Sequence, residues 1–227
     1  MKKILLITVC LIALPVFLID AQDWAGLSRY AKENAVLPAT PAKENRVIFM
    51  GNSITEGWIK KHPSFFEGKA YINRGISGQT SPQMLVRFRS DVINLHPKVV
   101  VILAGTNDIA GNTGSSTLEM IEDNLASMTE IAMANGIKVI LCSVLPVYDY
   151  PWKKGLEPAQ KIVTLNAWIK NYSTKKKIVF VDYFSAMVDE RHGLKAELTY
   201  DGVHPNQTGY LVMEPLVEKA IRQALLK

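Results

Sequence analysis

The ten residues VVVILAGTND, at positions 99–108, show the pattern that decides the fold of this chain. The run is continuously apolar and rich in β-branched residues, which is typical of a strand covered on both faces of its sheet. It ends at Gly105 and three polar residues, as a strand does where it enters a loop. The same pattern recurs along the chain and predicts its architecture.

Several runs of this kind predict strands at Arg46–Met50, Ala70–Asn73, Val99–Ala104, Ile137–Val144 and Ile178–Val181. Between them, helical spacing of apolar residues predicts helices over Ser81–Leu95, Thr117–Asn135, Ala159–Tyr172 and Gln207–Leu226. Strands that alternate with helices imply parallel βαβ units. We therefore expect an α/β protein, a three-layer α/β/α sandwich around a central, about five-stranded parallel sheet of the flavodoxin-like type.

The beginning of the chain has the features of a secretory signal peptide. Lys2 and Lys3 precede an apolar run from Ile4 to Ile19, and the small residue Ala21 follows it. We predict that residues 1–21 are a signal peptide and that the protein is exported, either periplasmic or extracellular. The remainder, residues 22–227, fits a single domain, because its length suits one core and it contains no internal repeat or linker.

A retained membrane anchor is the alternative interpretation of this N-terminus. The apolar run is short for a span of about 20 residues, and Pro15 lies inside it. Lipidation at Cys10 is disfavoured, because Val9 stands where such a signal has a small residue. We therefore expect no stable membrane insertion after cleavage. Cys142 is then the one cysteine left, and its apolar surroundings indicate a small buried hydrophobe.

Composition and charge argue against several classes of partner. The formal net charge is +5, but the basic residues are dispersed and form no stripe interleaved with aromatics, so nucleic acid is not an expected partner. No spacing of His, Cys, Asp and Glu suggests a metal site. The glycines of the chain fit neither the nucleotide nor the dinucleotide fingerprint, so we expect no cofactor. The sequence does not reveal the oligomeric state.

Two segments far apart in the sequence carry residue types suited to acyl transfer. Ser53 follows the first apolar run in Gly51-Asn52-Ser53-Ile54, and it opens a predicted helix. Asp201 and His204 lie together near the C-terminus in Asp201-Gly202-Val203-His204-Pro205. Asp201 could accept a hydrogen bond from one ring nitrogen of His204 while the other nitrogen takes the proton of Ser53. This combination is what acyl transfer through a covalent serine requires.

Other strand exits could supply hydrogen-bond donors for an oxyanion. Asn107 follows the third predicted strand, and Gly78 follows the second. Together with the backbone amide of Ser53, their N–H groups could point at one spot, since the carboxyl ends of parallel strands share an edge of the sheet. Taken alone, Ser53 could be a helix cap, and the others could be turn residues. Their joint position at the strand ends favours the catalytic interpretation.

Taken together, these segments resemble the ordered motif blocks of the SGNH hydrolases, also called the GDSL lipase/esterase superfamily. The blocks are Gly51-Asn52-Ser53, the Gly78 loop, Gly105-Thr106-Asn107-Asp108 and the segment from Asp201 to Pro205. The resemblance implies that Ser53 is the nucleophile, His204 the base and Asp201 the orienting acid. It also implies that Ser53, Gly78 and Asn107 form the oxyanion hole. The first block reads Gly-Asn-Ser-Ile rather than Gly-Asp-Ser-Leu, which resembles the branch related to platelet-activating-factor acetylhydrolase.

The segment from Leu145 to Pro158 is rich in aromatic and turn residues and should overhang the same edge of the sheet. We predict that Tyr148, Tyr150 and Trp152, with Trp58 from the helix after Ser53, form a substrate-binding wall. Aromatic faces suit sugar rings, which favours a carbohydrate substrate. The alternative is that these aromatics pack against one another and only stabilise the loop.

The expected function is a secreted serine esterase that removes small acyl groups, such as acetyl, from carbohydrates. A lysophospholipase or thioesterase acting on lipid esters is the main alternative. A non-catalytic carbohydrate-binding protein on the same fold is disfavoured because all the proposed catalytic groups are present. A flavodoxin-like nucleotide binder is disfavoured too, because it has no reason to carry Ser53 together with Asp201 and His204.

Overall fold

The computed structural model describes residues 23–38 and 44–226 of the chain. A parallel sheet of five strands lies at its centre, in the order β2-β1-β3-β4-β5. This confirms the predicted α/β class and the parallel sheet. The strands are β1 (Val47–Gly51), β2 (Tyr71–Gly75), β3 (Val99–Leu103), β4 (Lys138–Cys142) and β5 (Val179–Val181).

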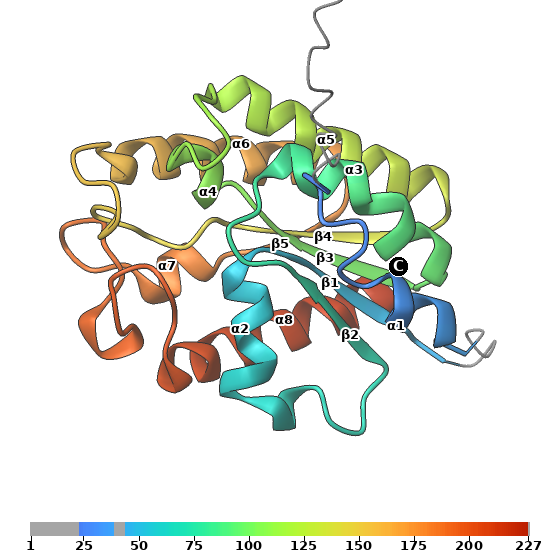
Figure 1. Ribbon diagram of the computed structural model, residues 1–227. Coiled ribbons are helices and arrows are strands. Elements are labelled where there is room, and N and C mark those ends of the chain that lie inside the picture. The colour runs from blue at the N-terminus through green and yellow to red at the C-terminus, as the bar shows by residue number, and fades with distance from the viewer. Residues whose placement is uncertain (1–22, 39–43, 227) are drawn as a thin grey trace, which may run out of the picture.

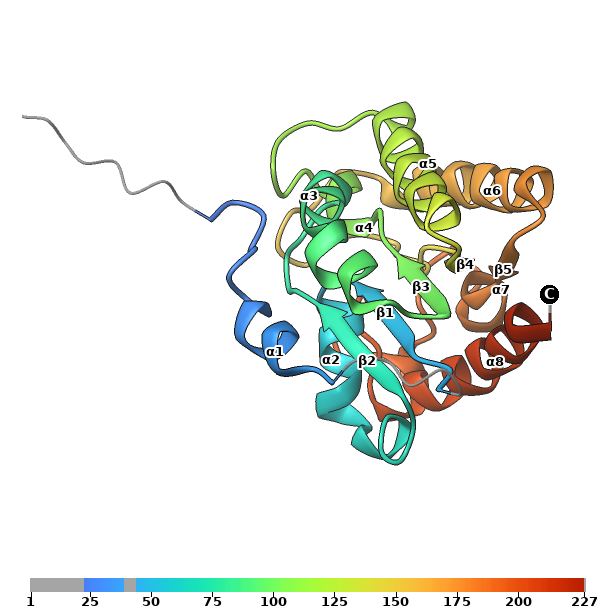
Figure 2. The same ribbon diagram turned by 90° about the vertical axis from the view of Figure 1, so that its right-hand side faces the viewer.

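Helices cover both faces of the sheet and give the molecule three layers (Figure 1). One face carries α3, α5 and α6, and the other carries α2, α7 and α8. The short α1 lies beside the edge strand β2, and α4 follows β3 directly (Figure 2). The helices are α1 (Ala31–Val36), α2 (Ser53–Lys61), α3 (Ser81–Asp91), α4 (Thr106–Ile109), α5 (Leu118–Ala134), α6 (Pro158–Lys176), α7 (Tyr183–Met187) and α8 (Gln207–Leu226).

The central strands are apolar along their whole length because each of their faces packs against a helical layer. In β1, Ile48 and Met50 belong to the core under α3, α5 and α6. Val47 and Phe49 point the opposite way, into the core under α2 and α8. Successive side chains of a strand alternate between its faces, so a strand buried on both faces needs apolar residues at every position.

Most boundaries fall within a few residues of those predicted from the sequence. The last helix has the predicted bounds, Gln207–Leu226, whereas β4 is shorter than the predicted run Ile137–Val144. At its C-terminal end, the backbone N–H of Val144 donates to the Asn166 side chain instead of continuing the ladder. Cys142 is buried on β4, and burial raises the pKa of its thiol to about 12, as expected of a small buried hydrophobe.

The predicted signal peptide, residues 1–21, lies outside the described residues. Within the part of the chain that the structure does describe, no helix is both long and apolar enough to cross a membrane. The first described segment packs along the edge of the sheet, where the Tyr30 hydroxyl donates to the carbonyl of Gly75 at the end of β2. The N-terminal segment therefore reaches the carboxyl end of the sheet.

Candidate active site

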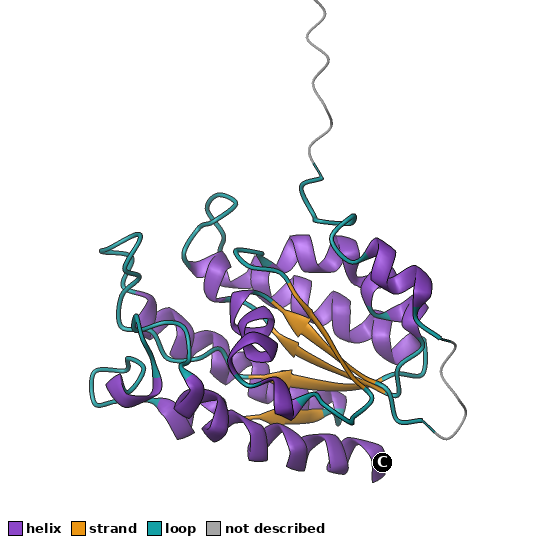
Figure 3. Ribbon diagram, turned by 60° about the horizontal axis from the view of Figure 1, so that its bottom comes forward, coloured by secondary structure: helices purple, strands orange, loops and turns teal. Residues whose placement is uncertain are grey.

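Ser53 lies at the point where β1 turns into α2, at the carboxyl end of the sheet. Figure 3 shows the strands as arrows and the loops that connect them to the helices in teal. Asn52 caps the helix, and its side-chain oxygen accepts a hydrogen bond of 3.0 Å from the backbone N–H of Ile54. Gly51 must be a glycine here, because an added Cβ would lie 2.0 Å from the Thr55 hydroxyl oxygen. The turn therefore presents Ser53 as the first residue of a helix, where backbone N–H groups have no intrahelical partner.

The hydroxyl of Ser53 lies 2.9 Å from Nε2 of His204. On the other side of the imidazole, Nδ1 lies 2.7 Å from Oδ2 of Asp201. An ionised carboxylate only accepts hydrogen bonds, so Nδ1 carries the proton and Nε2 is left to accept from the serine. The structure thus brings together a serine, a histidine and an aspartate that lie as far as 151 positions apart in the sequence.

Asp201 is held by the loop that carries His204. Burial alone would raise the pKa of Asp201, but hydrogen bonds from the His204 backbone, the imidazole and the Val203 backbone outweigh it and lower that pKa. The carboxylate is therefore ionised at neutral pH. Thr199 closes the loop, because its hydroxyl donates to the His204 carbonyl at 2.7 Å and accepts from the N–H of Gly202 at 3.0 Å.

The three predicted oxyanion donors line the same pocket. Asn107 is 3% exposed, and its Nδ2 donates to the carbonyl of Gln79 at 2.9 Å. An amide nitrogen has two N–H groups, so a second one is left for another acceptor. Gly78 has a positive φ of 79°, a backbone conformation that favours glycine. Among the described residues, none accepts a hydrogen bond from the backbone N–H of Ser53 or Gly78.

A buried polar network behind these donors was not found by sequence reasoning. Arg87 is fully buried on α3 and donates to the Gln79 side chain at 2.5 Å, to the Gly51 carbonyl at 3.1 Å and to Asp91 at 2.9 Å. The Gln79 side chain also donates to the carbonyl of Ala25 in the N-terminal segment. Arg87 therefore ties the turn before Ser53 to the loop that follows Gly78.

Asp108 and Tyr150 fix the short helix α4, which carries Asn107. The carboxylate of Asp108 accepts from the backbone N–H and the hydroxyl of Ser81, at the start of α3. Burial raises the pKa of Asp108, and the hydrogen bonds from Ser81 offset this only in part. The Tyr150 hydroxyl donates to the carbonyl of Thr106 at 2.7 Å. The position of Asn107 is thus set from two directions.

The pocket in front of Ser53 has a volume of about 470 Å³. Its walls come from α2, the loops after β2, β3 and β4, and the loop before α8. The lining residues are Ser53, Glu56, Gly57, Lys60, Lys61, Ser77, Gly78, Asn107, Asn112, Trp152, Tyr200 and His204. Of the predicted catalytic and oxyanion residues, all except Asp201 line this pocket.

The predicted aromatic wall is wrong at two positions. Trp58 is 2% exposed and stacks between Phe65 and Tyr210 inside the core. It stands five residues after Ser53, and a rotation of about 100° per residue turns it roughly 140° away from the serine. Tyr150 is fully buried, with its hydroxyl on Thr106. Neither side chain can touch a substrate in this pocket.

The other two predicted aromatics are exposed. Trp152 lines the pocket, and its ring centroid lies 6.0 Å from that of His204. Tyr148 is outside the lining, and the Arg191 guanidinium lies over its ring, 4.9 Å from the ring centroid. Sequence reasoning missed Tyr200, which lines the pocket and stacks on His204 with ring centroids 5.8 Å apart. Its position directly before Asp201 was the available signal.

A serine hydroxyl, an imidazole and a carboxylate joined in this order, at the strand ends of an α/β sheet, are the arrangement that serine hydrolases use. The model of the GDSL-like lipase/acylhydrolase family matches residues 49–212, and the chain belongs to this family. This agrees with the resemblance read from the motif blocks. The class of reaction is the hydrolysis of carboxylic esters.

A solved structure of a GDSL-like lipase from Bacteroides thetaiotaomicron is similar to this chain, with 54% sequence identity and a TM-score of 0.86. The match covers 88% of this chain and 98% of the lipase chain. The esterase TesA of Pseudomonas aeruginosa is 28% identical over 183 residues, which are 75% of this chain and 84% of TesA.

Two further relatives are matched over less than half of their own length. The acetylxylan esterase of Xylanibacter ruminicola is 23% identical over 82% of this chain and 45% of that protein. The lipoprotein YqeF of Bacillus subtilis is 35% identical over 81 residues, which are 34% of this chain and 33% of YqeF. The family model establishes the family of this chain, and these partial matches do not establish its substrate.

Proposed function

We propose that this protein is a serine esterase in which Ser53 is the nucleophile, His204 the base and Asp201 the residue that orients the base. The observation that carries the proposal is the continuous hydrogen-bonded line from the Ser53 hydroxyl through the imidazole to Asp201, with distances of 2.9 and 2.7 Å. A serine hydroxyl is a weak nucleophile unless an adjacent base takes its proton. His204 is the group in contact with it.

The reaction proceeds in two halves. Nε2 of His204 takes the proton from Ser53 as the serine oxygen attacks the ester carbonyl carbon, and the carbonyl oxygen becomes an oxyanion. The N–H groups of Ser53, Gly78 and Asn107 donate to that oxyanion. The imidazolium then protonates the departing alcohol, which leaves an acyl group on Ser53. Water, deprotonated by His204, attacks the acyl carbon and releases the acid.

The substrate that the pocket fits best is a short-chain ester of a carbohydrate, in particular an acetyl ester. Among the described residues, the lining contains no Leu, Ile, Val, Met or Phe, so it offers no aliphatic groove to a long acyl chain. Trp152 and Tyr200 instead place two aromatic rings beside His204, and aromatic faces suit sugar rings. Two proteins of similar fold or sequence, from Xylanibacter ruminicola and Geobacillus stearothermophilus, are acetylxylan esterases, which supports this choice.

Export belongs to the same proposal. The charged and apolar pattern of residues 2–21 favours a signal peptide, and one relative is a lipoprotein. A protein that acts on polymeric carbohydrate needs to meet it outside the cytoplasm. Mass determination of the mature protein secreted from a host cell would show the cleavage site, which we expect after Ala21.

The test is hydrolysis of 4-nitrophenyl esters from acetate to decanoate by the wild type and by Ser53→Ala. We expect the rate to peak at acetate and to fall by a factor on the order of 10⁴ or more in Ser53→Ala. Thermal unfolding of the variant should be close to that of the wild type, because only one partly exposed hydroxyl is removed. A peak at long chains would move the substrate to lipid esters. A rate independent of Ser53 would overturn the mechanism.

A further inference from the structure

We propose that the alcohol released by the reaction is a carboxylate-bearing sugar, and that Lys61 is the residue that selects it. This inference rests on the proposed function and adds the charge of the substrate to it. Both the distribution of charge around the pocket and the position of Lys61 relative to His204 support it.

Glu56, the one acidic residue among those that line the pocket, already has cationic partners. Glu56 accepts hydrogen bonds from the backbone and the hydroxyl of Ser77, and it pairs with Arg29 at 3.4 Å and Lys60 at 3.8 Å. Burial alone would raise the pKa of Glu56, but these partners outweigh it and lower that pKa. Glu56 is therefore ionised, and Arg29 and Lys60 share its one negative charge. Asp201 does not line the pocket, and its carboxylate accepts hydrogen bonds from the imidazole and from the backbone N–H groups of Val203 and His204.

Lys61 is the cation whose charge is left to face a ligand. Its Nζ lies 5.4 Å from the ring centroid of Tyr200, and the ion pair beside it on α2 involves Lys60 instead. Within the described part of the chain, no carboxylate forms a salt bridge with Lys61. An aromatic ring holds an ammonium group in place through its quadrupole but does not neutralise it. The Lys61 charge thus remains available to an anion.

The side of the pocket near Lys61 is the side on which the alcohol leaves. The departing oxygen takes its proton from Nε2 of His204, so the alcohol part of the substrate must lie against the imidazole. Trp152 and Tyr200 both lie beside that imidazole, and the Lys61 ammonium lies beside the Tyr200 ring. Ser53 begins α2 and Lys61 ends it, so the helix rise places the two Cα atoms about 12 Å apart along one wall.

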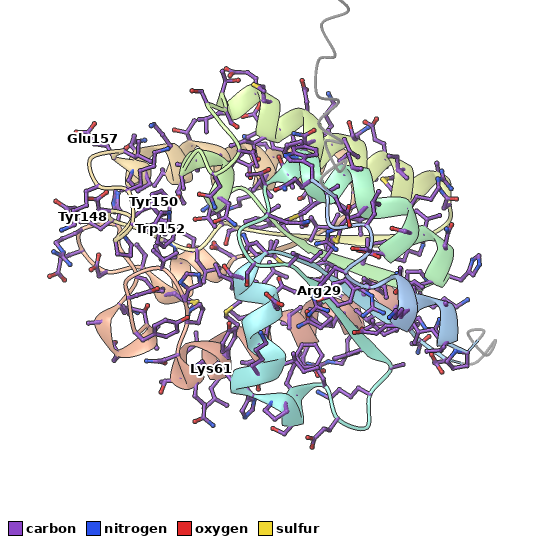
Figure 4. The ribbon with its side chains drawn as sticks, in the orientation of Figure 1. Arg29, Lys61, Tyr148, Tyr150, Trp152 and Glu157 are labelled. Atoms are coloured by element: carbon purple, nitrogen blue, oxygen red, sulfur yellow. The ribbon has the colours of Figure 1, made fainter. Side chains whose placement is uncertain are left out.

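This geometry fits a sugar that lies against the exposed ring of Trp152 and directs a carboxylate toward Lys61. Figure 4 shows that Lys61 and Trp152 come from different elements, the end of α2 and the loop after β4. An exposed ion pair contributes little to affinity, so the preference for the charged substrate should be modest. We expect it to be roughly two- to fivefold in kcat/KM at low ionic strength.

The test compares two substrates that differ only in charge. One is a methyl glucuronoside carrying a single acetyl ester, and the other is its C6 carboxamide with the same acetyl ester. Acetate release is measured for the wild type, Lys61→Met and Lys170→Met. Lys170 is an exposed lysine on α6, on the opposite face of the sheet, so its variant controls for the loss of one positive charge.

The wild type should prefer the carboxylate over the carboxamide, and Lys61→Met should show a ratio near one. The preference should also vanish in the wild type at about 0.5 M salt, which screens exposed charges. Lys170→Met should keep the wild-type ratio. A wild-type ratio of one, or an unchanged ratio in Lys61→Met, would overturn the inference. If 4-nitrophenyl acetate were still hydrolysed through Ser53 in that case, the proposed function would stand and only the selectivity would fail.

Discussion

The two sides of the pocket differ in burial and in hydrogen bonding. The oxyanion side consists of Gly78, Gln79, Asn107 and Asp108, with Arg87 behind them. Apart from Gly78, these residues are at most 4% exposed, and each of them has hydrogen-bond partners within the protein. The aromatic side consists of Trp152, Tyr200 and Lys61. Trp152 is 47% exposed and Tyr200 is 62% exposed.

This difference follows from what each side has to do. An oxyanion hole works only when its donors are held at hydrogen-bond distance from the position that the developing charge takes. Such precision needs side chains fixed by packing and by a second layer of hydrogen bonds. Recognition of the leaving alcohol needs contact area and charge, and exposed side chains supply both at little cost in stability. Substitutions on the two sides should therefore separate stability from selectivity.

The largest expected effect on the oxyanion side is the loss of stability in Arg87→Met. The change removes hydrogen bonds to Gln79, Gly51 and Asp91, and it leaves the Asp91 carboxylate buried without its cation. Removing one partner of a buried ion pair lowers the free energy of unfolding by about 3–5 kcal/mol. Urea unfolding measures this loss.

Two variants decide whether burial of the pair is the cause. Arg89→Met removes an exposed arginine from the same helix and should change the free energy of unfolding by less than about 0.5 kcal/mol. The double variant Arg87→Met with Asp91→Leu should recover part of the loss, because an apolar pair leaves no unpaired charge. Equal effects of Arg87→Met and Arg89→Met would contradict a buried network on the oxyanion side.

Asn107→Ala should act mainly on turnover. The variant loses one of three proposed oxyanion donors, which typically lowers kcat by a factor on the order of 10²–10³. KM should change far less, because the donor matters most once charge develops on the carbonyl oxygen. Steady-state kinetics with 4-nitrophenyl acetate give both constants.

Asn112→Ala is the matched comparison for Asn107. Asn112 also lines the pocket, but its amide donates to the carbonyl of Gly78 and so acts on the position of that loop. We expect a loss in kcat below about tenfold, the effect of one ordinary hydrogen bond. Similar losses for the two variants would remove the special role of Asn107.

Much of the fold could be predicted from the sequence because the pattern there is redundant. Each strand is marked both by its apolar run and by the glycine or polar residue that follows, as in Val99–Leu103 and Gly105. Long helices such as α8 carry many periods of apolar spacing. Strand ends are less certain. Val144 is as apolar as its neighbours, and only its hydrogen bond to Asn166, a tertiary contact, shows that β4 has ended.

The sequence predicted those site residues whose position depends on the backbone topology. It did not predict which aromatic side chains face the pocket, because that depends on the direction of each side chain. Ser53, His204 and Asp201 come together because of topology, which the sequence pattern reveals. Trp58 and Trp152 are both tryptophans near the strand ends, yet one faces the core and the other faces the pocket. Helical phase could have placed Trp58 correctly. The contacts of Arg87 depend on three segments meeting and leave no signal in any one of them.

The smallest expected effect, and the sharpest test of the aromatic side, is Trp152→Ala. Loss of an aromatic face beside His204 should raise KM for an acetylated sugar by roughly two- to tenfold and change kcat little. Because Trp152 is half exposed, the free energy of unfolding should change by less than about 0.5 kcal/mol. Trp58→Ala should do the reverse, with a loss of about 3–5 kcal/mol in stability, since it leaves a cavity in the core. If Trp152→Ala destabilised the protein as much as Trp58→Ala, its contact with Tyr150 would be structural, and the aromatic side would no longer differ from the oxyanion side.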